Sequence, residues 1–240
     1  MILHLSHSMT EISQIKLLGN IASPYTSRVQ FVLNLKSIKY ELIEEDFDDK
    51  SELLLTSNPL FKRVPVLLQS NKPPILESLI IIDYLEQIYP DVYKLYPYDH
   101  ADQAVLKFWA YYIDTEFFPL YGRLRKTPDK EGKEVLKKQI IEKSHVLENL
   151  FVKFSNGKPY FGGDDVGYLD VVLGCFLGWT KFVGNHNNFK IFDEVRTPNL
   201  IEWSKRMLSH ESLKGVIPDQ EIHIDFFKWL TKARPPPKAT

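Results

Sequence analysis

The feature that most constrains the fold of this chain is a change in its hydrophobic pattern near residue 90. Before that point, short apolar runs of strand length alternate with segments of helical period. After it, long segments of helical period follow one another without a convincing strand. Such a change predicts an α/β unit followed by an all-helical unit.

The first unit has the predicted order βαβαββα. Residues 15–20 and 40–43 predict strands, and Pro24 begins a helical pattern between them. The remaining elements are a short helix near 51–57, strands near 64–68 and 73–77, and a helix near 78–89. The first connection has to cross over and the last is a hairpin, so the sheet is mixed and helices pack on it. This order is the thioredoxin-like arrangement.

The second unit is predicted to consist of helices. Residues 103–126 and 131–154 have helical periodicity, whereas residues 162–179 begin with turn residues and then become almost wholly apolar. An apolar run of that kind predicts one helix buried on all sides. Asp170, near its start, is expected to accept backbone N–H groups at the helix N-terminus.

We therefore predict two domains with a flexible segment at each end. Residues 1–12 form an N-terminal extension in which Met9 is an alternative start, and residues 233–240 form a disordered tail with three consecutive prolines. The domains are a thioredoxin-like domain at 13–91 and an all-helical domain at 102–232, joined by a linker at 92–101.

The composition narrows the functional classes. Lys and Arg total 30 against 31 for Asp and Glu, so no strong positive field favours nucleic acid or anionic lipid. The opening residues do not fit a secretory signal, and no segment approaches the roughly 18 apolar residues of a membrane span. We therefore expect a cytoplasmic protein without a nucleic-acid or membrane partner.

The single cysteine, Cys175, lies in an apolar stretch, which favours a buried structural thiol.

Two prolines mark positions with alternative interpretations. Ser23 stands directly before Pro24 and fits a helix N-cap followed by a first-turn proline, although the same position suits a hydroxyl that faces a substrate. On local rules, capping is the better supported interpretation of Ser23. Pro65 follows Val64 where a central strand does not tolerate proline, which predicts a strand start, an edge strand or a cis bond.

Acidic residues raise two further possibilities. Glu77 and Ser78 stand at a strand-to-helix junction, where free N–H groups and the helix dipole attract an anion. The equal alternative to an anion site is that Ser78 is an ordinary helix cap and that Glu77 precedes it by chance.

The acidic residues at 44–49 lack the glycine-turned loop of a calcium site, which favours a solvated face over a metal site. No metal is expected.

Four stretches of the chain stand in register with one known family. They are ASPYTSR, DDKSELLLTSNPLFKRVPVLL, LESLIIIDYLE and FGGDDVGYLDVVLGCFLGW. Together they closely resemble the plant tau class of glutathione transferases over about residues 12–230. The resemblance implies the cytosolic glutathione transferase architecture and an enzyme that conjugates glutathione to hydrophobic electrophiles, with glutathione-dependent hydroperoxide reduction as an additional activity. It also implies a homodimer, with glutathione as co-substrate and no tightly bound cofactor.

The resemblance assigns a glutathione site residue by residue. Ser23 matches the catalytic serine, and Pro65 matches the family's cis-proline. Glu77 and Ser78 match the pair that holds the γ-glutamyl end, where opposite charges meet and the helix N-terminus faces a carboxylate. The remaining matches are Lys50 near the glycine end, Arg63 where the family usually has lysine, and Val64, whose backbone pairs with the cysteinyl part.

The acceptor pocket of the family is built from a long helix, the buried helix and the C-terminal segment of the second domain, with one residue from the first. The matching positions are Tyr25, Phe118, Gly122, Arg125, Trp179, Phe226 and Leu230. Many family members carry Arg and Trp at the positions of Gly122 and Arg125, so the acceptor preference is expected to differ here. Plain core packing is the alternative for the aromatic residues. A carrier of hydrophobic metabolites or hormones is the alternative function.

Overall fold

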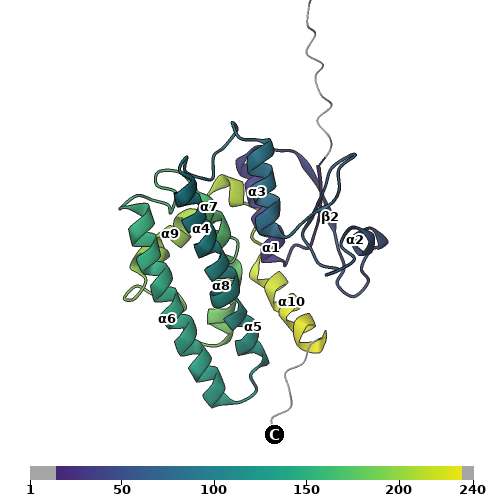
Figure 1. Cartoon of the computed structure of the whole chain (residues 1–240). Coiled ribbons are helices and arrows are strands. Elements are labelled where there is room, and N and C mark those ends of the chain that lie inside the picture. Colours follow the sequence, from purple (N-terminus) through teal and green to yellow (C-terminus); the bar gives the residue numbers. More distant parts are fainter. Residues whose placement is uncertain (1–14, 234–240) are drawn as a thin grey trace, which may run out of the picture.

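The structure is a computed structural model that describes residues 15–233, and Figure 1 shows their arrangement. The predicted extension at 1–12, the alternative start at Met9 and the part of the tail beyond Ala233 lie outside the described residues. Within the described range, no helix is long and apolar enough to cross a membrane.

The first half of the chain contains the predicted mixed sheet. Strand β2 pairs in parallel with β1, β3 runs antiparallel to β1, and β4 runs antiparallel to β3, giving the order β2-β1-β3-β4. The observed order of elements confirms the prediction βαβαββα. The elements are β1 (Ile15–Gly19), α1 (Pro24–Leu35), β2 (Tyr40–Glu44), α2 (Glu52–Ser57), β3 (Val66–Leu68), β4 (Ile75–Leu76) and α3 (Ser78–Ile88).

Helices cover both faces of this sheet because successive strand residues point to opposite sides. Leu17 and Leu67 belong to the main core, which includes the apolar faces of α1 and α3. Leu18 and Val66 point the other way and pack with Leu54 of α2. Figure 1 shows α1 and α3 side by side, with α2 at the far side of the sheet.

The turn between β1 and α1 is short because a glycine ends the strand. A Cβ atom at Gly19 would overlap Cγ2 of Thr26, so only glycine lets the first turn of α1 pack so close to the end of β1. The Thr26 hydroxyl accepts a hydrogen bond from the Asn20 amide at 3.2 Å. This turn fixes the position of Ser23, which immediately precedes α1.

The second half of the chain is helical, as predicted. An isolated bridge between Tyr160 and Gly163 is the one strand-like pairing recorded there within the described residues. Figure 1 shows α10 between the other helices and the sheet-containing half. The elements are α4 (His100–Tyr112), the π-helical turn η1 (Ile113–Phe117), α5 (Pro119–Lys126), α6 (Lys130–Ser155), α7 (Tyr168–Gly174), α8 (Leu177–His186), α9 (Pro198–Leu208), the 3₁₀ turn η2 (Glu211–Leu213) and α10 (Gln220–Ala233).

The single helix predicted over 162–179 was wrong in its length. The structure has two helices, α7 and α8, which are separated at Cys175 and Phe176. The helical ladder weakens at this point, where Cys175 N lies 3.5 Å from Val171 O and Phe176 N bonds instead to Leu173 O at 3.1 Å. Helix α7 itself is buried along its whole length, as predicted.

Asp170 organises the start of α7 as the sequence predicts. Its carboxylate accepts hydrogen bonds from three backbone N–H groups and from the indole of Trp203, at 2.7 to 3.0 Å. The backbone donors are Phe161, Gly162 and Gly167. Burial raises the pKa of Asp170 to about 6, although each donated hydrogen bond lowers it. One side chain thus joins the preceding loop, α7 and α9.

Candidate active site

The strand register brings the three candidate loops to one edge of the sheet. Leu18 of β1 pairs with Val66 of β3, and Val66 pairs with Leu76 of β4. The segment after β1, the segment before β3 and the segment after β4 therefore lie side by side at the same edge of the sheet. They are the loop to Ser23, the Val64–Pro65 dipeptide and the Glu77–Ser78 junction.

Ser23 caps α1 and is 7% exposed. Its Oγ accepts the backbone N–H of Thr26 at 3.3 Å, which confirms the cap that local rules predict. Within residues 15–233, no acceptor is recorded for the hydroxyl proton of Ser23. Capping and donation to a ligand are therefore compatible, because the hydroxyl accepts with its oxygen and donates with its proton.

The Val64–Pro65 peptide bond is cis, as the resemblance implies. Pro65 is buried directly before β3, and Val64 is half-buried against the core on the α2 side of the sheet. Of the predicted alternatives, the cis bond is observed, and β3 begins at Val66, directly after Pro65. Because Val66 pairs with Leu18 of β1, the backbone of Val64 lies at the sheet edge near the loop that leads to Ser23.

Glu77 has an unusual backbone conformation. Its φ is +66°, in the region that favours glycine, and its exposed side chain makes no capping hydrogen bond. For a residue other than glycine, such a conformation costs of order 1–3 kcal/mol and occurs often at ligand sites. The structure places Ser78 as the first residue of α3, so the predicted serine cap is replaced by Glu77 in the cap position.

Arg28 links the Glu77–Ser78 junction to the helical half of the chain. This fully buried guanidinium donates to Ser78 Oγ at 3.0 Å and to the Val172 carbonyl at 3.1 Å. It also forms a bidentate ion pair with Asp114 of η1, at 2.8 and 2.7 Å. Since Ser78 Oγ accepts from Arg28, the hydroxyl proton of Ser78 is directed away from Arg28.

The two basic candidates, Lys50 and Arg63, lie close to the Val64–Pro65 dipeptide. Lys50 Nζ donates to the Lys62 carbonyl at 2.9 Å, which holds the loop before α2 against the loop after it. The Arg63 side chain is exposed, and its carbonyl accepts from the Asn58 amide at 2.9 Å. Both cations thus stand beside the Val64–Pro65 dipeptide at the outer rim of the site.

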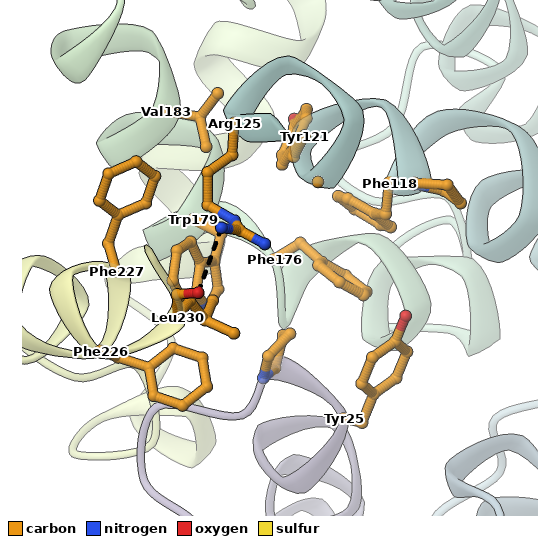
Figure 2. A pocket seen from close by; sticks show the side chains of 13 residues that line it. Tyr25, Phe118, Tyr121, Arg125, Phe176, Trp179, Val183, Phe226, Phe227 and Leu230 are labelled. Atoms are coloured by element: carbon orange, nitrogen blue, oxygen red, sulfur yellow. Dashed lines mark hydrogen bonds between the residues drawn. The ribbon is translucent and has the colours of Figure 1, made fainter. Parts of the chain in front are cut away.

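A second, apolar compartment adjoins Ser23. It is a cavity of about 280 Å³, and all seven residues of the predicted acceptor pocket line it (Figure 2). They come from α1, α5, α8 and α10 and from the turn before α5. The complete lining is Pro24, Tyr25, Phe118, Pro119, Tyr121, Gly122, Arg125, Phe176, Trp179, Val183, Phe226, Phe227 and Leu230.

Direct contacts join this cavity to the serine loop. Pro24 and Tyr25 of the lining follow Ser23 in the chain, and Trp179 Nε1 donates to the Ala22 carbonyl at 3.0 Å. Burial raises the pKa of Tyr25 to about 12, so its phenol is neutral at physiological pH. Ser23 therefore stands between a polar sheet edge and an apolar cavity.

Comparison with known proteins agrees with this two-part site. The family model described as the glutathione S-transferase N-terminal domain matches residues 17–92. Glutathione S-transferase U17 of Arabidopsis thaliana is 40% identical over 228 residues, which cover 95% of this chain and 99% of that protein. The tau class glutathione S-transferase MiGSTU from mango, Mangifera indica, has a crystal structure with a TM-score of 0.87 and 40% identity, covering 90% of this chain and 98% of that one.

The chain belongs to the tau class of glutathione S-transferases. A crystal structure of rice OsGSTU1 in complex with glutathione is also similar, with a TM-score of 0.80 and 29% identity, covering 91% of this chain and 98% of that one. These similarities confirm the resemblance and the fold class predicted from the sequence. The roles of the individual site residues stay predictions.

In this transferase the acidic stretch at 44–49 is part of the architecture. Glu45 is 1% exposed and accepts from the Ser51 hydroxyl at 2.7 Å, so the predicted solvated face was wrong for this residue. Glu44 accepts from the Ile21 amide at 2.9 Å. Within residues 15–233, no group of three or more His, Cys, Asp or Glu side chains is arranged to hold a metal ion.

Four residues form a contact that we name the α10 latch: Phe47, Asp48, Phe226 and Trp229. Trp229 Nε1 donates to Asp48 Oδ1 at 2.7 Å, and the three rings lie with centroids 5.3 Å apart. The latch joins the loop that carries Lys50 to the helix that supplies Phe226 to the cavity. It holds the C-terminal wall of the cavity against the first half of the transferase.

Sequence reasoning missed part of the cavity and the whole Arg28 cluster. Phe176 stacks on Phe118 and lies three residues before Trp179, so its helical spacing was an available signal. Phe227 directly follows Phe226, which was predicted. No local signal indicated Arg28, because its partner Asp114 lies 86 residues away in the chain.

Proposed function

We propose that this transferase conjugates the thiol of glutathione to hydrophobic electrophiles, with Ser23 as its catalytic residue and hydroperoxide reduction as an additional activity. The observation that carries the proposal is the position of Ser23, between a polar edge suited to glutathione and an apolar cavity suited to an acceptor. The names of the similar proteins, which describe transferases, favour turnover over the carrier alternative.

Glutathione would bind along the sheet edge with each charged end facing an opposite charge. The γ-glutamyl ammonium faces Glu77, and its carboxylate faces the hydroxyl of Ser78 and the N-terminus of α3. The Val64 backbone pairs with the cysteinyl part next to Pro65. At the glycine end, the carboxylate faces the two cations of the rim, Lys50 and Arg63.

Ser23 supplies enough stabilisation to make bound glutathione reactive. A free thiol has a pKa near 8.5 and is mostly protonated at neutral pH, whereas the thiolate is the nucleophile. A hydroxyl that donates to the thiolate contributes about 1.5–3 kcal/mol, which lowers the pKa of the thiol by roughly one to two units. The N-terminus of α1 directs a partial positive charge to the same place. Ser23 therefore acts as a hydrogen-bond donor and does not have to act as a base.

Two substitutions separate the capping role of Ser23 from the catalytic one. Glycine is nearly as good an N-cap as serine, whereas alanine costs about 0.5–2 kcal/mol of stability. Ser23→Gly is therefore expected to keep the fold and to lose conjugation activity by roughly 10- to 100-fold, as a lost charge-assisted hydrogen bond implies. Ser23→Ala is expected to lose the same activity and also stability.

The measurements are turnover of a chloronitroarene with glutathione, the ultraviolet titration of the bound thiolate, and thermal unfolding. A hydroperoxide assay tests the additional activity. Asp129→Gly removes a cap from α6 at a residue that does not line the cavity, and it serves as the control for cap loss alone. Undiminished turnover in Ser23→Gly would overturn the assignment. Tight ligand binding without turnover in the unsubstituted protein would favour the carrier.

We also propose that the transferase acts as a homodimer in the cytoplasm. Val105, Phe108 and Tyr111 recur at intervals of three on α4 and are 43%, 58% and 64% exposed. Large apolar side chains that share one helix face and remain exposed mark an interaction surface. Phe108→Glu is expected to convert the dimer to a monomer in light-scattering measurements of molar mass. A wild-type monomer would contradict the dimer, and fractionation of cells tests the location.

A further inference from the structure

The loop that leads to Ser23 is a tight turn held by its own hydrogen bonds. Ser23 N donates to the Asn20 carbonyl at 2.9 Å, which closes the turn, and Ala22 N donates to Asn20 Oδ1 at 2.9 Å. The Asn20 side chain also donates to the backbone carbonyl of Glu45 at 3.0 Å. The first half of the chain thus anchors Asn20, whereas the carbonyl directly before Ser23 has a partner from elsewhere.

That partner is a tryptophan of the helical half. Trp179 Nε1 donates to the Ala22 carbonyl at 3.0 Å, although the two residues lie 157 positions apart in the chain. Within residues 15–233, this is the one hydrogen bond recorded between the turn at 20–23 and the helical half. The polar contact from the helical half to this turn therefore depends on one side chain.

The hydrogen bond of Trp179 acts on the peptide unit that precedes the serine. The Ala22 carbonyl and the Ser23 N–H belong to one planar unit. Trp179 holds the carbonyl end of this unit, and Asn20 holds its N–H end. The orientation of the plane sets the direction in which the Ser23 side chain leaves the backbone, because only φ and ψ are free to rotate. Without the indole donor, one end of the plane is free to turn.

The indole itself has little freedom to move. Trp179 lies on α8, and its ring meets three other rings nearly edge-on, an arrangement that aromatic pairs favour. The distances between ring centroids are 4.9 Å to His223, 5.5 Å to Phe182 and 5.8 Å to Phe226. The same indole lines the acceptor cavity (Figure 2). A donor held in this way can hold the peptide plane that accepts from it.

We propose that Trp179 is a positioning residue for Ser23, whose indole N–H fixes the peptide plane before the serine and so directs the serine hydroxyl toward the sulfur of glutathione. The inference rests on the proposed function, because it takes Ser23 as the donor to the thiolate. It adds a second role to a residue assigned only to the acceptor cavity. Since a hydrogen bond weakens steeply as its angle departs from linear, a rotation of the serine raises the pKa of the bound thiol.

The test is the ultraviolet titration of the thiolate at saturating glutathione without an acceptor, so that changes in acceptor binding do not enter. Trp179→Phe loses the indole N–H and part of the ring. Benzothienylalanine at position 179 places sulfur where the N–H group was and keeps the ring size. Phe227→Leu is the control, because Phe227 lines the same cavity and its ring packs on Phe182 and His186. Ser23→Gly measures the full contribution of the hydroxyl.

Both changes at Trp179 are expected to raise the pKa of the bound thiol by roughly 0.4–1 unit, as the loss of one neutral hydrogen bond implies. Phe227→Leu is expected to keep the wild-type pKa while it raises the KM for the acceptor. If Ser23→Gly raises the pKa and the benzothienylalanine variant does not, the inference is overturned and the proposed function stands. If Ser23→Gly leaves the pKa unchanged, the proposed role of Ser23 fails, and this inference fails with it.

Discussion

Replacing Asp170 with alanine is expected to be among the most destabilising single changes in this transferase. The carboxylate accepts four hydrogen bonds at 2.7 to 3.0 Å and is fully buried. Each buried donor left without a partner destabilises the fold by about 1–3 kcal/mol. For four donors this gives roughly 4–12 kcal/mol, and water that enters the vacated space recovers part of it. We expect a loss of at least about 4 kcal/mol, a large fraction of the stability of a typical domain.

Asparagine provides an intermediate case at the same position. Oδ1 of Asp170 accepts from Phe161 and Trp203, and Oδ2 accepts from Gly162 and Gly167. Asp170→Asn keeps one acceptor oxygen and turns an NH₂ group toward the two donors that faced the other. Its loss of stability is therefore expected to lie between zero and that of Asp170→Ala.

The assay is chemical unfolding followed by far-ultraviolet circular dichroism, at one protein concentration and at pH 8. At that pH the carboxylate is charged, because burial raises its pKa only to about 6. Asp164→Ala serves as the control, since Asp164 pairs with Lys158 at the exposed surface of the same loop and such pairs contribute about 0–1 kcal/mol. A loss below about 2 kcal/mol in Asp170→Ala would refute the reasoning, because it would mean that the four donors find other partners.

Three further outcomes follow from the described contacts. Gly122→Ala is expected to raise the free energy of unfolding by about 0.5–1 kcal/mol, because alanine favours the helix and no atom blocks its Cβ. The Tm should rise by a few degrees, and a lower Tm would contradict this prediction. Trp229→Phe removes the hydrogen bond to Asp48 and should speed amide hydrogen exchange in α10, whereas unchanged exchange would show that the latch does not hold this helix. Burial lowers the pKa of His223, so the fold keeps its ring neutral while the unfolded chain binds a proton near pH 6.5. Stability should therefore fall as the pH drops below 6.5, and a His223→Gln variant with the same pH dependence would count against this assignment.

Short-range patterns predicted the elements that short-range forces determine. Short apolar runs predicted the strands β1 and β2, and the Ser23–Pro24 pair predicted the start of α1 between them. The break between α7 and α8 was not predicted, because the residues around Cys175 are uniformly apolar and the interruption appears only in the backbone hydrogen bonds. Local rules therefore located the segments but not this interruption.

The candidate site was predicted by resemblance, and its long-range contacts were not. The seven acceptor positions meet at one cavity because the family pattern carries their spacing over the whole chain. Glu45 was assigned to a solvated face, since an acidic run gives no sign of which carboxylate turns inward to Ser51. Arg28 was overlooked for a similar reason, because an arginine on an amphipathic helix resembles a surface residue until Asp114 is placed beside it.

The open space beside Gly122 has an evolutionary consequence. A single base change in a glycine codon can give alanine, and the Cβ of an alanine at this position of the cavity lining would have no neighbouring atom within 4 Å. The residues proposed to hold glutathione lie on the sheet edge, outside the lining of this wall. Under the proposed roles, a duplicated copy of this transferase could therefore acquire a different acceptor wall in one mutational step while the proposed nucleophile site stays the same.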